Sequence, residues 1–397
     1  MTASKTQALA QTTSVQTTPA QATSAQTTST QTTSAQTTPA QTNPAQTKLT
    51  QAEPGPSAWP TPIEIPAWTK TLRIGGGTIL YWFQPIDLGP KIVELYASLL
   101  LNADLGRFAI HIEPRFRDTK HRAFFTSNIW LQEAYVSADL GPATVKVGKV
   151  YSRLGLFWDR SFYGNIQLYD GMKTNPNYGV SLESKDPPAD RDLAFHYVLQ
   201  YFLSDGTTNN SLVARDTISL PGGRRLNDFV ARVGPFLRLG HGMTLEAAAS
   251  GEYFQADLPD GTHDVVRGAV DTTLKGDGFE LRAEYQHQWG QSVHEFPYRA
   301  VPATATSPAL PGRFSKNNDY VLVGADLNWW RLTLRYNGSA GFYNDVSVKE
   351  WIHAPALAIK PHDNVMVLTE YVIWPRHAPE GTSLVDRSFN LSVQSHF

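Results

Sequence analysis

The chain has 397 residues, of which 41% are hydrophobic and 18% are charged, and its formal net charge is -2. The near-neutral charge argues against nucleic acid or an anionic membrane surface as the main partner. The absence of cysteine excludes a disulfide scaffold and any site that needs a cysteine ligand or nucleophile. The densest apolar run, residues 193–203, is broken by His196 and Gln200 and is too short for a spanning helix, which excludes a helical membrane protein.

The N-terminal segment is a low-complexity tract. A glutamine falls at every fifth position from Gln11 to Gln51, Thr, Ser, Ala and Pro fill most of the gaps, and no aromatic residue precedes Trp59. Such a tract cannot bury enough apolar surface to offset the entropy of ordering it. We therefore predict a disordered arm over residues 1–58 and a single folded domain over residues 59–397.

The first ten residues bear on export. They lack the basic start and apolar stretch of a signal peptide, yet Ala8-Leu9-Ala10 before Gln11 has the small-x-small form of a signal-peptidase site. We expect that an apolar segment lies upstream of the recorded start. The alternative is that an alanine-rich tract produces such a triplet by chance.

From about residue 70 the side chains alternate with a period of two, which is typical of β-strands. Residues 107–117 show the pattern clearly. One face suits lipid and carries Phe108, Ile110, Ile112, Pro114 and Phe116, whereas the other suits water and carries Arg107, His111, Glu113, Arg115 and Arg117. The triplet Gly75-Gly76-Gly77 lies within such a pattern and lacks a nucleotide-binding context, so it predicts strand curvature or close packing.

The alternating segments number about sixteen. They are 70–83, 92–104, 106–118, 128–140, 143–150, 177–184, 192–203, 227–239, 243–256, 263–275, 278–289, 319–328, 330–338, 349–359, 363–374 and 386–397. Most are long enough to cross a bilayer when tilted, and short links tend to alternate with long ones. This asymmetry is expected of an outer-membrane barrel and not of a soluble sandwich. The fold class predicted is an all-β, antiparallel transmembrane β-barrel, wide enough at sixteen strands to hold water.

Tryptophans fall near the ends of several predicted strands, where aromatic girdles of membrane barrels lie. They are Trp82, Trp289, Trp329, Trp330 and Trp374. The alternative for each is a place in a buried core.

The last segment places Phe389, Leu391, Val393 and Phe397 on one face, and the chain ends on the aromatic residue. It resembles the C-terminal assembly signal of Gram-negative outer-membrane proteins, with Ser395 where a larger apolar residue is more usual. The stretch Glu133-Ala134-Tyr135-Val136, a turn at Gly141-Pro142, and Val145 to Lys149 resembles a hairpin of bacterial porins, in particular the broad phosphate-selective porin group. Phosphate selectivity does not carry over, because the lysine clustering of a phosphate channel is absent.

The porin resemblance implies that the loop over residues 151–176 folds into the barrel and constricts it. Its charged residues are Arg153, Asp159, Arg160, Asp170 and Lys173. Alternatively, they only pin the loop to the wall or cap its exposed end. The expected channel-lining residues are Arg107, His111, Glu113, Arg115, Arg117, Glu133, Lys146, Arg282, Arg331 and Arg335. A basic cluster among them motivates the hypothesis of a mild preference for anions, against the alternative of a wall without selectivity.

The function predicted is passive diffusion of small hydrophilic solutes or ions across the bacterial outer membrane. We expect no enzymatic step, no catalytic residue, no cofactor and no metal site. The expected partners are the lipid bilayer, the barrel-assembly machinery, small polar solutes and, by resemblance, two further copies in a homotrimer, with no nucleic acid. The alternatives are a channel specific for a sugar, organic acid or polymer, an outer-membrane hydrolase, and an adhesin or structural barrel.

Overall fold

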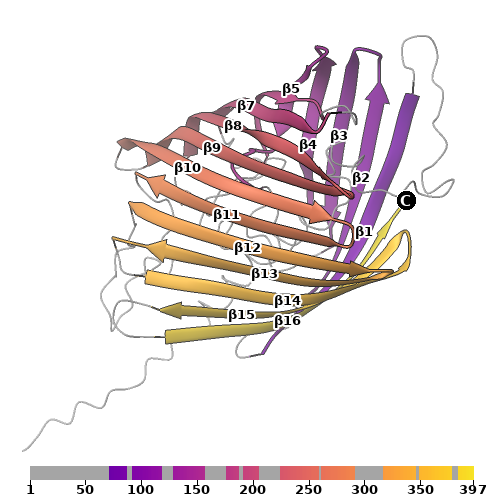
Figure 1. The fold of residues 1–397 in the computed structure, drawn as a ribbon, viewed down its shortest axis with the longest axis vertical. Coiled ribbons are helices and arrows are strands. Elements are labelled where there is room, and N and C mark those ends of the chain that lie inside the picture. Colours follow the sequence, from indigo (N-terminus) through magenta and orange to yellow (C-terminus); the bar gives the residue numbers. More distant parts are fainter. Residues whose placement is uncertain are drawn as a thin grey trace, which may run out of the picture.

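A computed structural model describes residues 71–86, 92–118, 128–156, 176–186, 191–204, 224–258, 261–290, 316–345, 348–377 and 383–397. Sixteen antiparallel strands, each paired with its neighbours in sequence, form a closed barrel (Figure 1). No helix in the described ranges is long and apolar enough to cross a membrane. The predicted arm over residues 1–58 lies outside the described residues and stays a prediction.

The sixteen predicted strands are all present. Their bounds are β1 Thr71–Pro85, β2 Ile92–Asp104, β3 Phe108–Arg117, β4 Ile129–Asp139, β5 Ala143–Val150, β6 Asn177–Ser184, β7 Leu193–Ser204, β8 Arg224–Gly240, β9 Met243–Leu258, β10 Gly261–Gly276, β11 Phe279–Trp289, β12 Asn317–Trp329, β13 Leu332–Tyr343, β14 Val348–His362, β15 Val365–His377 and β16 Ser383–His396. The largest difference concerns β13, predicted at residues 330–338. Trp330 has a positive φ of 52° and lies in the turn before this strand, which then continues to Tyr343.

The barrel closes through its first and last strands. β1 pairs with β16 from Gly77 opposite His396 to Pro85 opposite Ser388. Beyond that ladder, Gly76 N–H donates to Phe397 O at 3.2 Å and Phe397 N–H donates to Gly76 O at 3.1 Å. The terminal residue of the chain is therefore part of the closing seam, and no sheet edge remains open.

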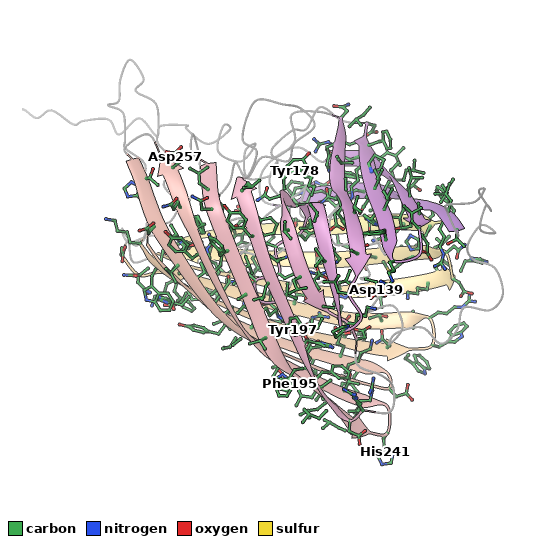
Figure 2. The ribbon with its side chains drawn as sticks, turned by 90° about the horizontal axis from the view of Figure 1, so that it is seen from above. Asp139, Tyr178, Phe195, Tyr197, His241 and Asp257 are labelled. Atoms are coloured by element: carbon green, nitrogen blue, oxygen red, sulfur yellow. The ribbon has the colours of Figure 1, made fainter. Side chains whose placement is uncertain are left out.

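The two faces of each strand differ in the way that the alternation predicts. On β11, Glu280, Arg282 and Glu284 are buried toward the barrel interior, whereas Leu281 and Tyr285 are 43% and 45% exposed on the outer face. β7 likewise exposes Phe195, which points away from the barrel in Figure 2. The outer face therefore carries large apolar side chains, and the charged ones lie inside.

Connections differ in length between the two ends of the barrel. His241, in the two-residue β8–β9 turn, lies at one end, and Asp257, near the end of β9, lies at the other (Figure 2). At the His241 end the connections have two or three residues, as predicted, apart from the eight residues 185–192 between β6 and β7. The strand ends that the long connections 151–176, 205–223 and 290–316 join lie at the Asp257 end. At the same end, β9 and β10 are separated by two residues, 259–260.

Part of the interior is apolar. A buried cluster lines β1 and β12 to β15 and consists of Tyr81, Phe83, Tyr320, Tyr343, Ile352, Ala354, Ala358, Leu368, Val372 and Trp374. Trp374 corrects the girdle prediction, since it is 2% exposed and its indole Nε1 donates to Glu350 Oε2 at 3.0 Å. The other four girdle tryptophans are exposed. The error arose because the prediction used only the position of Trp374 near a strand end, which does not determine the side to which a residue points. Trp374 lies an even number of residues from inward Val372 and Leu368, so it shares their inward face.

Candidate functional site on the inner wall of the barrel

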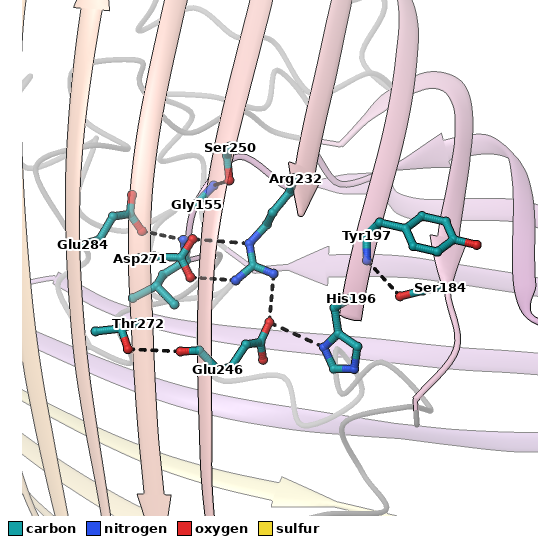
Figure 3. A network of polar contacts seen from close by, with 11 residues as sticks. Gly155, Ser184, His196, Tyr197, Arg232, Glu246, Ser250, Asp271, Thr272 and Glu284 are labelled. Carbon is teal, nitrogen blue, oxygen red and sulfur yellow. Dashed lines mark hydrogen bonds and ion pairs between the residues drawn. The ribbon is translucent and has the colours of Figure 1, made fainter. Parts of the chain in front are cut away.

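The segment after β5, residues 151–156, runs across the barrel interior. Gly155 N–H donates to Ser250 Oγ on β9 at 3.1 Å, and Leu156 N–H donates to Glu284 Oε2 on β11 (Figure 3). β9 and β11 lie four and six strands from β5 around the barrel. Such contacts require the segment to leave its own wall and reach the facing one.

The root of this segment is fixed to the wall that it leaves. The Gln200 side chain accepts from Arg153 N–H at 2.8 Å and donates to Tyr151 O at 2.9 Å. Leu154 packs in a buried apolar cluster with Val150, Phe202, Val230 and Ala269. Burial raises the pKa of the Tyr151 phenol above its ordinary value, so this hydroxyl stays neutral. Both ends of residues 151–156 are therefore held.

A network of charged side chains lies on β7 to β10, near the point where the segment docks (Figure 3). Arg232 Nη2 contacts Asp271 Oδ1 at 2.6 Å, and its Nη1 contacts Glu246 Oε1 at 2.9 Å. His196 Nδ1 lies 3.6 Å from the same Glu246 oxygen. One guanidinium thus bridges carboxylates of two neighbouring strands.

Nearer the Asp257 end, two arginines share one glutamate. Arg225 and Arg267 contact the two oxygens of Glu252 at 3.1 and 2.9 Å. Both guanidinium groups lie over the Phe254 ring, at 4.1 and 4.9 Å from its centroid. The ring and the carboxylate hold the two cations together despite their like charge.

A third network lies on β11 to β13. Arg282 contacts Glu280 at 3.1 Å and Asp326 at 3.3 Å, and Arg335 contacts Asp326 at 3.1 Å. Of the predicted channel-lining residues, the structure thus places buried Arg282 and half-buried Arg335 in one cluster on the inner wall.

The predicted basic cluster is not a uniformly basic wall. Arg115 Nε contacts Glu113 at 2.8 Å, Lys146 contacts Glu183 at 2.7 Å, and Arg117 lies over the Trp130 ring at 5.4 Å. The carboxylates of Glu113 and Glu183 therefore offset the positive charges of Arg115 and Lys146 on this part of the wall.

Two predicted lining residues are not on strands. Arg107 lies in the exposed turn before β3, and Arg331 lies in the turn before β13, where its guanidinium donates to Pro361 O. These positions correct the prediction that both residues belong to alternating strands. Of the predicted constriction residues, Arg153 belongs to the inward segment, whereas Asp159, Arg160, Asp170 and Lys173 lie outside the described residues.

Carboxylates outnumber cations among the buried charged residues of the described part of the chain. The eleven carboxylates are Glu94, Glu113, Glu183, Asp228, Glu252, Asp271, Glu280, Glu284, Asp326, Glu350 and Glu370. The six lysines and arginines are Arg115, Arg117, Lys149, Arg225, Arg267 and Arg282. Sequence reasoning overlooked six of these carboxylates, although all six lie in predicted strands whose alternation marks the inward face. They are Glu94, Glu183, Asp228, Asp326, Glu350 and Glu370.

Comparison with known proteins gives the fold and no closer relationship. No family model matches the chain, and no curated protein matches it. Among solved structures, the outer membrane channel DcaP of Acinetobacter baumannii is similar with a TM-score of 0.57 and 15% identity, covering 84% of this chain and 99% of that one.

Two further solved structures are similar over most of both chains. OmpF of Salmonella typhi has a TM-score of 0.56 at 10% identity, covering 85% of this chain and 100% of that one. An anion-selective porin from Comamonas acidovorans has a TM-score of 0.55 at 8% identity, covering 82% and 99%. The chain therefore has the closed-barrel fold of outer-membrane porins.

Proposed function

We propose that this chain is a bacterial outer-membrane channel through which small hydrophilic solutes or ions diffuse passively, without an enzymatic step. One observation carries the proposal: the strands of a closed barrel expose apolar side chains outward and bury charged ones inward. A soluble barrel needs the opposite arrangement, with its apolar core inside. The porin-like fold supports the same function.

The arrangement suits a bilayer for a second reason. Lipid offers no hydrogen-bond partners, so every backbone group of a spanning sheet has to be paired within the protein. The continuous ladder from β1 through β16, completed by Gly76 and Phe397, meets this requirement. The lipid bilayer of the outer membrane is accordingly the main proposed partner.

The lumen of this channel is narrow. Residues 151–156 cross it, and inward side chains such as Glu94, Glu350 and Asn390 are fully buried. An inner wall open to a wide water column would expose such side chains. This packing supports passage of small solutes, and it also favours the second candidate, a channel specific for one class of polar solute.

The proposed charge preference is a weak one for cations. The excess of buried carboxylates over lysines and arginines makes the potential of the inner wall negative on balance. The ion pairs of Arg115 and Lys146 weaken the case for the anion preference expected from the basic cluster. The selectivity of the Comamonas acidovorans porin is a property of that protein, and the shared fold does not transfer it.

Two partners follow from the proposal. Phe389, Val393 and Phe397 lie exposed on the outer side of β16, with Leu391 half-buried on the same side. We assign this row to recognition by the barrel-assembly machinery. Porin-like barrels of this size commonly form trimers, so a homotrimer is proposed as well.

Liposome swelling tests the function. Vesicles containing the folded protein should swell in small sugars, and the rate should fall steeply as the sugar grows, because the lumen is narrow. A shift in gel mobility on boiling identifies folded protein in the same vesicles. Folded, inserted protein that never increases swelling above that of empty vesicles would contradict a channel and favour an adhesin or structural barrel.

A further inference from the structure

Three potential metal ligands meet on the inner wall, at the pairing of β3 with β4. His111 and Glu113 come from β3 and Glu133 from β4, and one ligand atom from each lies within 4.8 Å of the other two. Residues 111 and 113 share a face because a strand alternates with period two. Glu133 is the register partner of Glu113, so the two carboxylates stand directly opposite each other.

Two carboxylates in this position repel each other. Like charges directly across a strand pair are destabilising, and burial increases the cost because water no longer screens them. Glu113 is fully buried, and the side chain of Glu133 is 15% exposed. Arg115 contacts Oε1 of Glu113, but Oε2 has no hydrogen-bond donor among the described residues. Lys146 and Arg153 act on Glu133 through space, and Lys146 itself contacts Glu183 at 2.7 Å. Glu113 Oε2 is therefore the carboxylate oxygen that is left without a donor, within the described part of the chain, where the two carboxylates and the histidine converge.

The histidine is oriented as a ligand. His111 Nδ1 lies 2.8 Å from Asn102 Oδ1, an oxygen that can only accept, so Nδ1 carries the proton. Nε2 then presents a lone pair to the carboxylates, with Glu133 Oε2 at 3.9 Å. This nitrogen is buried and has no hydrogen-bond partner among the described residues. Metal-binding histidines characteristically donate their other N–H in this manner.

The local backbone supports the same reading. The register between β3 and β4 shifts between Glu113 and Pro114, which marks a β-bulge or irregularity at this pair. Bulges re-aim side chains and are frequent beside functional sites. The His111 ring also stacks on Tyr135 with centroids 4.7 Å apart, which holds the imidazole plane in place.

We propose that His111, Glu113 and Glu133 bind a divalent first-row transition metal ion, with Zn²⁺ as the representative. An imidazole nitrogen combined with two carboxylate oxygens suits this class better than Mg²⁺ or Ca²⁺, which prefer oxygen alone. Ligand atoms around one Zn²⁺ stand roughly 3.3 Å apart, so side-chain rotations of about an ångström close the site. The ion would neutralise the facing carboxylates, and it would occupy the lone pair of His111.

The site is distinct from the other histidine–carboxylate contact on the inner wall. His196 lies 3.6 Å from Glu246, but that carboxylate already contacts the Arg232 guanidinium. A positive charge therefore already stands where a metal ion would have to lie. His196 is thus a matched control for a buried histidine beside a glutamate.

Zinc binding to the full, untagged chain, folded in detergent micelles, tests the proposal. Titration with ZnCl₂ against a fluorescent chelator should give one tight site for the wild type and for His196→Ala. His111→Ala and Glu133→Gln should weaken that site by more than tenfold, and Asn102→Ala by about 10- to 100-fold through loss of ring orientation. A mobility shift on boiling confirms that each variant is folded.

Two results would overturn the proposal. One is wild-type affinity in folded His111→Ala and Glu133→Gln, since zinc would then bind elsewhere. The other is the absence of a tight site in the folded wild type. Both readouts measure binding alone, so they are independent of whether the barrel conducts solutes.

Discussion

Gly76 shows how a single residue determines closure of the barrel. A Cβ atom at this position would lie 2.4 Å from Ser98 O and 2.8 Å from the Phe397 ring, both closer than real contacts allow. Ser98 belongs to β2 and Phe397 follows β16, so the glycine lets both neighbours of β1 approach. The sequence prediction of close packing at the glycine triplet is confirmed here.

Gly76→Ala should therefore destabilise the barrel by about 1–3 kcal/mol, the usual cost of overpacking. The control is Gly251→Ala in β9, where the nearest atom to a new Cβ is a backbone oxygen at 3.9 Å. Urea unfolding in lipid vesicles, followed by tryptophan fluorescence, measures the difference. Equal stability of the two variants would show that the closing seam tolerates a side chain.

The substitution Arg232→Ala measures how much an ion pair of the inner wall contributes to the free energy of unfolding. Removing the arginine leaves Asp271, whose side chain is 1% exposed, without its cation, at a cost of about 3–5 kcal/mol. Lys185→Ala breaks an exposed pair with Asp139 and should cost less than about 1 kcal/mol. The same unfolding assay compares them. Similar small losses for both variants would mean that water in the lumen screens Arg232 fully.

The sequence does not predict which charged residues of the inner wall form ion pairs with one another. Parity shows that Arg232 and Asp271 point inward, but 39 residues separate them. Their contact depends on the register of β8, β9 and β10 and on the reach of each side chain. For the same reason, the sequence presents Arg115 and Lys146 as a basic cluster without revealing that Glu113 and Glu183 pair with them.

At the level of the elements, the strands were largely predictable. A barrel wall has one apolar and one polar face, so a period of two marks each strand and turn residues mark its ends. The prediction stopped five residues short in β13 because Gly338 to Tyr343 is rich in small residues that show no alternation. The short separation of β9 and β10 was overlooked, although Pro259-Asp260-Gly261 is a sequence typical of tight turns.

The inward course of residues 151–156 was expected only through the porin resemblance, since no local pattern encodes a contact 128 residues away. Glu284 anchors the far end of this segment by accepting from Leu156 N–H. Glu284→Ala should therefore free the segment and raise the single-channel conductance. Glu280→Ala removes the same charge from the same face of β11, where Arg282 is the partner, and should leave the conductance near the wild-type value.

An equal effect of Glu284→Ala and Glu280→Ala on the conductance would contradict this prediction. If Glu284→Ala and Glu280→Ala change the conductance alike, loss of a lumen charge explains the effect. The segment would then not narrow the path that ions take.

For the whole molecule, the balance of buried charge predicts the direction of selectivity. The described residues include eleven buried carboxylates and six buried lysines and arginines. Under a KCl gradient, the sign of the reversal potential should therefore indicate a preference for K⁺ over Cl⁻. High salt on both sides should weaken the preference, because it screens the wall. A reversal potential that indicates a preference for Cl⁻ would show that the ion-paired carboxylates contribute little to the electrostatic potential along the lumen.

The central claim is that a lipid-facing barrel encloses a path for water and ions, and single-channel recording in planar bilayers tests it most directly. Folded protein, identified by its mobility shift on boiling, should insert in discrete and reproducible conductance steps. Boiled protein from the same preparation should give none. Folded protein that enters the bilayer without any step in conductance would contradict the account.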